Sequence, residues 1–201
     1  MTRVVLATRN SKKLTELRRI LAEASVAGVE IIGLDDVPPF PEEPETGATF
    51  EENAVAKAAA AAKATGLPSI ADDSGIAVEA LNGMPGVLSA RWAGKHGDDQ
   101  ANLELLLGQL ADVPDHRRGA AFVAAAALVL PDGTQTVVRA EWPGTITREP
   151  RGTNGFGYDP IFVPEGETRT SAELSPEEKD AHSHRGKALR LLLPSLRELA
   201  D

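Results

Sequence analysis

The sequence predicts an α/β protein with a mixed β-sheet, and three observations lead to this prediction. Residues 3–7 and 29–34 are apolar, β-branched stretches on either side of a helical pattern, which is typical of a β-α-β unit. Residues 120–130 and 136–142 flank the turn sequence Pro131-Asp132-Gly133-Thr134, which indicates an antiparallel hairpin. Because a β-α-β unit has parallel strands, the two patterns together predict strands of both directions in one sheet.

The composition is that of an ordinary globular chain, with 201 residues, 42% hydrophobic and 25% charged. This length suits a single domain, residues 1–201, with a core of its own. A net charge of −9 argues against binding of nucleic acid polymers through a basic surface. The absence of cysteine excludes thiol catalysis, disulfides and thiolate zinc sites. The sequence shows neither a signal-peptide pattern nor an apolar run of about 18 residues, so we expect a cytoplasmic protein without a membrane segment.

The first predicted strand leads through a polar segment, Thr8 to Lys13, into a helix whose leucines recur at helical spacing. The free N–H groups and the dipole of a helix start favour an anion. Thr8, Asn10 and Lys13 add a hydroxyl, an amide and a positive charge there. The segment fits a phosphate-binding loop, and it fits equally a plain helix cap with exposed lysines. It is not a Walker A loop, whose glycine pattern is absent from the sequence.

A loop rich in proline and acidic residues follows the second strand. It spans residues 35–47, and its glutamates are Glu42, Glu43 and Glu45. Thr49-x-x-Glu52 then forms a capping box before an alanine-rich helix that carries Lys57. The glutamates are either solvated or within reach of the acidic residues that follow this helix. Lys57 is either a surface charge or part of the same site.

The stretch Ile70–Val78 places two neighbouring carboxylates, Asp72 and Asp73, and the hydroxyl of Ser74 between two apolar runs. We expect a strand that ends in an acidic turn, followed by a return strand from Gly75. Neighbouring carboxylates repel each other, so a buried pair usually holds a cation, and Mg²⁺ prefers oxygen ligands. A solvated Asp-Asp-Ser turn is the alternative interpretation.

The next helix is capped by Asp98 or Asp99, and its leucine stripe belongs to the core. After the hairpin, which residues 145–148 extend, residues 152–160 gather three glycines around Phe156. Glycine lets a backbone approach a ligand closely, and Phe156 offers a face on which a base can stack. A tight turn with a core aromatic explains the same pattern.

The last segment begins with a capping box and a proline at the first helical position, Ser175-Pro176-Glu177-Glu178. A cluster of Lys179, His184 and Arg185 follows, and these side chains suit a phosphate or a purine carbonyl. The leucine-rich residues 189–199 are predicted to form core helix, interrupted at Pro194.

Six motifs, in order from residue 4 to about residue 190, resemble those of the inosine/xanthosine triphosphate pyrophosphatases, a family that clears noncanonical purine nucleotides. They are Thr8-x-Asn10-x-x-Lys13, Glu45-Thr46-Gly47-x-Thr49-Phe50-x-Glu52-Asn53-Ala54, Ala71-Asp72-Asp73-Ser74-Gly75, Pro85-Gly86-Val87-x-Ser89-Ala90-Arg91, Asn154-Gly155-Phe156-Gly157-Tyr158-Asp159-Pro160 and Ser183-His184-Arg185. Arg9 stands where many relatives have a small residue.

The resemblance implies an elongated mixed sheet flanked by helices, with two lobes and the substrate in a central cleft. It also implies a homodimer that hydrolyses ITP, dITP and XTP to the monophosphate and pyrophosphate with Mg²⁺. Such an enzyme keeps these nucleotides out of DNA and RNA.

Roles of individual residues follow from the same resemblance. Thr8, Asn10, Lys13 and Lys57 would bind the triphosphate. Glu45 and Asp73 would bind Mg²⁺, with Glu42 or Glu43 as alternatives to Glu45, and Asp73 would also be the base for the attacking water. Ser74 would touch the substrate, and Phe156 would stack on the base. Asp159, Lys179, His184 and Arg185 would complete the recognition of the base, and Gly157 and Tyr158 would also bind the substrate.

Two other functions are compatible with these motifs. One is a pyrophosphatase for different altered nucleotides, such as modified pyrimidines, which the base-recognition residues would distinguish. The other is a nucleotide-binding regulator without turnover, although binding alone does not require a base such as Asp73.

Overall fold

The computed structural model describes residues 1–42 and 44–200 and contains a six-stranded sheet with the order β2-β1-β3-β4-β5-β6. β1 (Thr2–Leu6) pairs in parallel with β2 (Val29–Ile32) and with β3 (Ser69–Val78). β5 (Gln135–Ile146) follows β4 (Gly119–Val129) and pairs antiparallel with β6 (Phe162–Pro164). The predicted α/β class and the mixed sheet are therefore confirmed.

The chain divides into two compact units. Unit 1 comprises Met1–Asp73, Ala124–Ala140 and the segment from Arg185 onward, and unit 2 comprises Ser74–Val123 and Glu141–His184. Three strands, β3, β4 and β5, contribute residues to both units. The assignment of residues 1–201 to a single domain stays a prediction.

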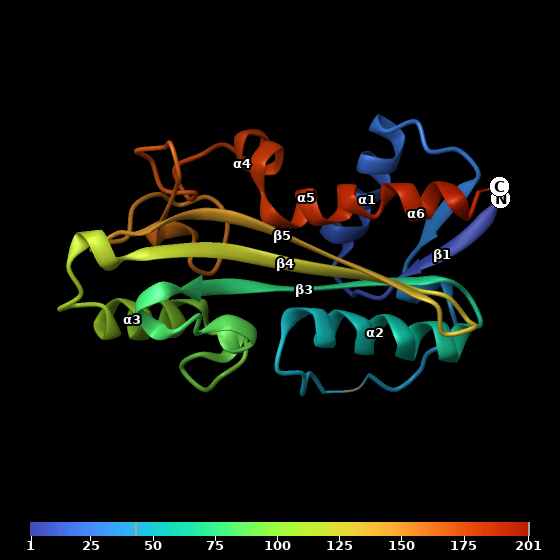
Figure 1. Cartoon of the computed structure of the whole chain (residues 1–201), viewed down its shortest axis with the longest axis horizontal. Coiled ribbons are helices and arrows are strands. Elements are labelled where there is room, and N and C mark those ends of the chain that lie inside the picture. The colour runs from blue at the N-terminus through green and yellow to red at the C-terminus, as the bar shows by residue number, and fades with distance from the viewer. Residues whose placement is uncertain (43, 201) are drawn as a thin grey trace. The chain divides into compact units, whose positions relative to one another are not determined.

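The strands of unit 1 have helices on both faces (Figure 1). α1 (Ser11–Glu23), α5 (His184–Leu191) and α6 (Leu193–Glu198) lie on one side, and α2 (Phe50–Thr65) lies on the other. Leucines of the first group, such as Leu17 and Leu189, pack with Leu6 and Ile70 in one apolar cluster. This burial fixes α1 and α5 against the strand that carries the two aspartates.

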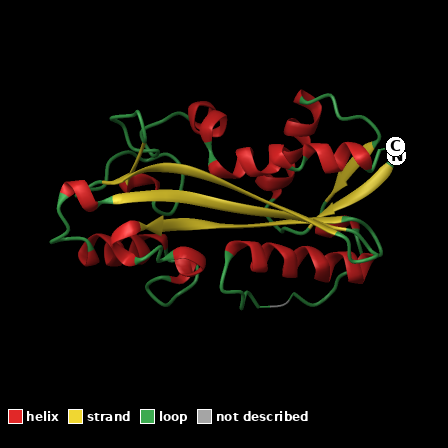
Figure 2. Ribbon diagram, viewed as in Figure 1, coloured by secondary structure: helices red, strands yellow, loops and turns green. Residues whose placement is uncertain are grey.

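Local sequence explains α2. The Thr49 hydroxyl accepts a hydrogen bond from the N–H of Glu52, and Gly66 ends the helix with a left-handed φ of +67°. The buried face consists largely of alanines, Ala54, Ala58, Ala61 and Ala62. Figure 2 shows this helix beside the strands of unit 1 and also the turn of the β4–β5 hairpin.

Unit 2 has its own core. Leu106 and Leu110 come from α3 (Asp99–Gln109) and the residue that follows it, and they pack in a cluster with Ile76, Ile161 and Phe162. α4 (Pro176–His182) begins at the predicted capping box, in which Ser175 and Glu178 bond each other's backbone. Within residues 1–42 and 44–200, none of the helices has both the length and the apolar character that a membrane crossing requires.

The predicted acidic turn at Asp72-Asp73 is wrong, because β3 runs through both residues without a turn. The two carboxylates do not depend on solvent exposure in a turn, because side chains of α1 and α2 donate hydrogen bonds to them. Gly75 lets β3 pass close to Ser89, because a Cβ at this position would lie 2.4 Å from the Ser89 hydroxyl oxygen. The hairpin is confirmed, β5 extends to Ile146, and the C-terminal helix breaks before Leu193, one residue from Pro194.

Candidate active site

The loop before α1 is organised by its own side chains. The Asn10 amide oxygen accepts from the N–H of Lys12 at 3.0 Å and caps the helix. The Thr8 hydroxyl accepts from the N–H of Asn10 at 3.1 Å. The capping interpretation therefore holds for Asn10, and the same turn presents the helix N-terminus that an anion would use.

Asp72 is a buried carboxylate held by two cations. Lys13 Nζ donates to its Oδ2 at 2.8 Å, and Arg185 Nε donates to the same oxygen at 3.2 Å. Burial alone would raise the pKa of this carboxyl, but the charges of Lys13 and Arg185 and the hydrogen bond from Lys13 outweigh it, so the pKa falls to about 2. Asp72 is therefore ionised at any physiological pH.

Asp73 has different surroundings, although it is the next residue. The Asn53 amide donates to Asp73 Oδ2 at 2.9 Å, and Lys57 Nζ lies 4.0 Å from Oδ1. Lys57 also donates to Glu45 Oε1 at 2.6 Å. The ammonium of Lys57 thus lies near both carboxylates that the sequence predicted as metal ligands.

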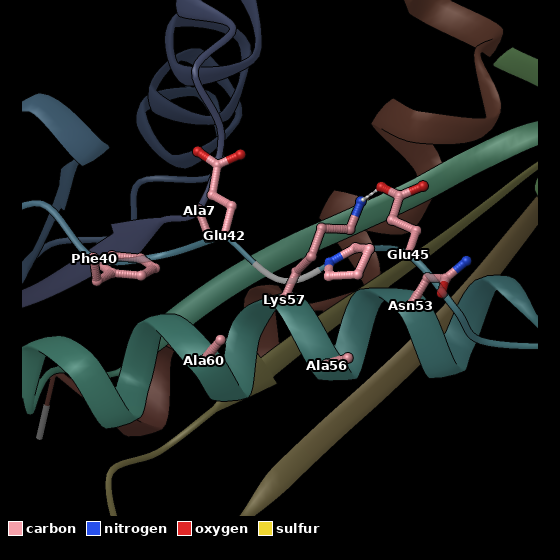
Figure 3. A pocket seen from close by; sticks show the side chains of 9 residues that line it. Ala7, Phe40, Glu42, Glu45, Asn53, Ala56, Lys57 and Ala60 are labelled. Atoms are coloured by element: carbon pink, nitrogen blue, oxygen red, sulfur yellow. Dashed lines mark hydrogen bonds and ion pairs between the residues drawn. The ribbon is translucent and has the colours of Figure 1, made fainter. Parts of the chain in front are cut away.

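Of these residues, Asn53, Lys57 and Glu45 line a cavity of about 130 Å³ in unit 1, between α2 and the acidic loop (Figure 3). Asn53 and Lys57 project from α2, while Phe40, Glu42 and Glu45 come from the loop. Glu42, predicted as an alternative ligand, accepts from Arg9 Nε at 2.5 Å, and this contact joins the acidic loop to the loop before α1. Glu43, the other alternative, lies outside the described residues.

Glu45 and Asp73 are the carboxylates here that could hold a metal ion. Among the described residues, no group of three or more His, Cys, Asp or Glu side chains forms a complete metal cage. Mg²⁺ is usually held by one or two carboxylates together with phosphate oxygens, so Glu45 and Asp73 would suffice. In this structure, the ammonium of Lys57 is a positive charge beside these two carboxylates.

A second cavity of about 130 Å³ lies in unit 2, and the predicted base-binding residues other than Arg185 line it. Phe156 is 78% exposed, and Lys179 Nζ lies 5.0 Å from the centroid of its ring. Buried Asp159 accepts from Lys179 Nζ at 2.5 Å and from the N–H of Phe156 at 2.9 Å. His184 stacks on Phe122 with ring centroids 5.1 Å apart. The cavity thus combines an exposed aromatic face with donors and an acceptor.

The glycines of this segment bring the backbone against Asp159. Gly155 has a φ of +74°, and a Cβ there would lie 2.1 Å from Asp159 Oδ2, so only glycine fits. The N–H of Gly157 donates to Asp99 Oδ2 at 3.1 Å. Tyr158 is buried, and its hydroxyl donates to the Ser89 carbonyl at 2.7 Å. Burial raises the pKa of this phenol, as does the charge of Asp99, so Tyr158 stays neutral and anchors the loop.

The structure divides the predicted site residues between the two units. Unit 1 holds Thr8, Asn10, Lys13, Glu45, Lys57, Asp73 and Arg185, and unit 2 holds Ser74, Phe156, Gly157, Tyr158, Asp159, Lys179 and His184. Arg185, predicted at the base, contacts Asp72 and Glu16 in unit 1. The two sets meet in the sequence at the Asp73–Ser74 and His184–Arg185 peptide bonds.

Sequence reasoning gave no role in the site to Asn53, Asp99 or Ser171. Asn53 and Lys57 are four residues apart and therefore share a face of α2, a spacing that could have pointed to Asn53. Ser171, whose hydroxyl donates to Asp159 Oδ1 at 2.7 Å, lies in a segment without any such signal.

Comparison with known proteins gives consistent similarities. A "dITP/XTP pyrophosphatase" of Nocardia farcinica is 71% identical over 201 residues, covering 100% of this chain and 98% of that protein. A protein of the same name from Mycobacterium tuberculosis is 66% identical over 200 residues, with coverages of 100% and 98%.

Solved structures show the same relationship. The structure of a nucleoside-triphosphatase / dITP/XTP pyrophosphatase from Mycobacterium abscessus has a TM-score of 0.85 and 62% identity, covering 97% of this chain and 100% of that one. A HAM1 protein from Coxiella burnetii has a TM-score of 0.89 and 44% identity, with coverages of 98% and 100%. The profile of the Ham1 family matches residues 4–195. The chain therefore belongs to the Ham1 family.

Proposed function

We propose that this chain is a nucleoside triphosphate pyrophosphatase that hydrolyses ITP, dITP and XTP to the monophosphate and pyrophosphate with Mg²⁺. The observation that carries the proposal is the position of Lys57 between Glu45 and Asp73. If Lys57 paired with a substrate phosphate instead, these two carboxylates could bind a metal ion. The names of the relatives, at 71% and 66% identity, support the same reaction.

The triphosphate end of the substrate is assigned to unit 1. Lys13 and Lys57 supply positive charge, and the start of α1 supplies backbone N–H groups beside Thr8 and Asn10. When bound, Mg²⁺ neutralises charge on the phosphate oxygens and orients them. Glu45 and Asp73 are the residues that would hold it.

Asp73 is assigned to the chemical step. Its carboxylate accepts a proton from a water molecule, whose oxygen attacks the α-phosphorus. The bond between this phosphorus and the oxygen bridging to the β-phosphorus breaks, and pyrophosphate leaves with that oxygen. The Asn53 amide, which bonds Asp73 Oδ2 at 2.9 Å, fixes the orientation of the base.

The purine is assigned to unit 2. Phe156 offers its exposed face for stacking, with Gly157 and Ser74 lining the same cavity. Hypoxanthine and xanthine carry a 6-oxo acceptor, which suits donors on Lys179 and His184, and an N1–H donor, which suits an acceptor such as Asp159. Adenine has a 6-amino group instead and would leave each such donor unpaired, at a cost of about 1–3 kcal/mol.

We further propose a homodimer that acts in the cytoplasm on small nucleotides and binds neither nucleic acid polymers nor membranes. The net charge of −9 supports the exclusion of polymers. Size-exclusion chromatography with light scattering tests the dimer, and a mass of one chain would refute it.

The proposed activity is tested with a substrate panel of ITP, dITP, XTP, GTP, ATP and dUTP, each with and without Mg²⁺. Pyrophosphate and orthophosphate are measured separately. We expect Mg²⁺-dependent release of pyrophosphate from the first three, with GTP and ATP nearly untouched. Preference for dUTP would favour a pyrimidine enzyme, and tight binding of ITP without product would favour a regulator.

A further inference from the structure

Asp72 joins two cations that are far apart in the sequence. Its Oδ2 accepts from Lys13 of α1, 59 residues before Asp72, and from Arg185 of α5, 113 residues after Asp72. Its side chain is only 2% exposed, and those of Lys13 and Arg185 are 27% and 13% exposed. The guanidinium also pairs through Nη1 with Glu16, one turn beyond Lys13 on α1. Four alternating charges therefore form one network within unit 1.

This network makes Asp72 a poor metal ligand. One of its oxygens already contacts an ammonium and a guanidinium, so a divalent cation at that oxygen would lie against two positive charges. Asp73, by contrast, accepts a hydrogen bond at Oδ2 from the neutral amide of Asn53, and Lys57 Nζ lies 4.0 Å from its Oδ1. The two neighbouring aspartates therefore have different surroundings and suit different tasks.

We propose that Asp72 is a positioning residue that holds Lys13 in place for the phosphates of the substrate, with Arg185 as its second anchor. The inference rests on the proposed function, because Lys13 is assigned there to the triphosphate. A free lysine side chain loses much rotamer freedom when it binds a ligand. A lysine already held at 2.8 Å from a buried carboxylate has lost that freedom in advance.

An alternative role for Asp72 predicts an effect of the opposite sign. If the carboxylate only neutralises charge, its removal makes the region more positive, and an anion should bind more tightly. If the carboxylate positions Lys13, its removal should weaken anion binding despite the added positive charge. The sign of the change in affinity therefore separates positioning from neutralisation.

The variants for this test are Asp72→Asn, which is isosteric and uncharged, and Asp72→Glu, which keeps the charge but is one methylene longer. Asp35→Asn is the matched control, since it removes one negative charge from an exposed position of unit 1. The probe is inorganic triphosphate, which lacks a base and reports only on phosphate binding. Its dissociation constant is measured by calorimetry for each variant, with circular dichroism as a check of folding.

We expect Asp72→Asn to weaken binding of inorganic triphosphate about tenfold or more, the order of magnitude that corresponds to holding one long side chain. Asp72→Glu lengthens the buried side chain but keeps the charge that pairs with Lys13, so it should weaken binding less, and Asp35→Asn should leave it unchanged. Removing Lys13 first, as Lys13→Ala, should abolish most of the effect of Asp72→Asn. Unchanged or tighter binding in either folded Asp72 variant would overturn the proposal.

The Mg²⁺ dependence of ITP hydrolysis distinguishes positioning of Lys13 from metal binding and from a purely structural role of Asp72. Asp72→Asn should raise the KM for ITP while the Mg²⁺ concentration at half-maximal rate stays as in the unmodified chain. Asp73→Asn should shift that Mg²⁺ concentration upward or abolish turnover. An equal upward shift in Asp72→Asn would make Asp72 a metal ligand and refute positioning. If the unmodified chain releases no pyrophosphate, the proposed function fails, and the binding of inorganic triphosphate still decides the role of Asp72.

Discussion

Two phenylalanines of unit 2 differ in burial so strongly that their removal should separate substrate binding from stability. Phe156 is 78% exposed, whereas Phe162 is fully buried and packs edge-on against Phe122 with centroids 4.6 Å apart. The perturbation is the same in each case, a change of Phe to Ala. The expected effects fall on different quantities.

The magnitudes follow from these surroundings. Phe156→Ala removes little buried surface, so the free energy of unfolding should change by less than about 0.5 kcal/mol. Loss of a stacked base should cost about 1–3 kcal/mol in ITP binding, which is about 5- to 150-fold in the dissociation constant. Phe162→Ala leaves a cavity in the core and should cost about 3–5 kcal/mol of stability.

The assay pairs urea denaturation of each variant with binding of ITP and of inorganic triphosphate. Phe156→Ala should lose affinity for ITP and keep that for inorganic triphosphate, which has no base to stack. Unchanged ITP binding would refute the stacking role of Phe156. A stability loss in Phe156→Ala as large as that of Phe162→Ala would refute the burial argument.

Three further predictions concern charged groups. Asp73→Asn should lower kcat by about 10²- to 10⁴-fold, the usual contribution of a general base, with the fold intact by circular dichroism; a near-normal kcat would remove Asp73 from the mechanism. Arg118→Met should lower the free energy of unfolding by about 3–5 kcal/mol in urea denaturation. The reason is that the buried guanidinium donates to the carbonyls of Leu110, Ile146 and Thr147. The exposed control Arg117→Met should change this free energy by less than about 0.5 kcal/mol. The pKa of Asp72 falls from 3.8 to about 2, so its ion pairs stabilise the fold above pH 3.8 and are lost as the pH falls through about 2. This contribution is worth about 2 kcal/mol, so the stability difference between the unmodified chain and Asp72→Asn should shrink by that amount on acidification; a constant difference would contradict the low pKa.

Patterns that depend on local physics were predictable from the sequence. The caps at Thr49 and Ser175 and the hairpin around Gly133 are encoded within a few residues, and the structure contains each of them. The β-α-β start was predictable for the same reason, because helical and strand periodicities are read directly along the chain.

Features that depend on distant partners were not predictable in this way. The turn expected at Asp72 is a continuous strand, since Lys13, 59 residues earlier, and Arg185 stabilise the charge there. The burial of Arg118 was missed because its partners are backbone carbonyls, which any sequence provides. Predicting these contacts would require knowing the packing of α1 and α5 beforehand.

The most direct test of the proposed reaction is hydrolysis of ITP in water labelled with heavy oxygen, followed by mass spectrometry of both products. Attack on the α-phosphorus, with Asp73 as base, predicts that the label enters the nucleoside monophosphate and that pyrophosphate stays unlabelled. Label in pyrophosphate, or release of labelled orthophosphate, would place the attack on another phosphorus and contradict the mechanism.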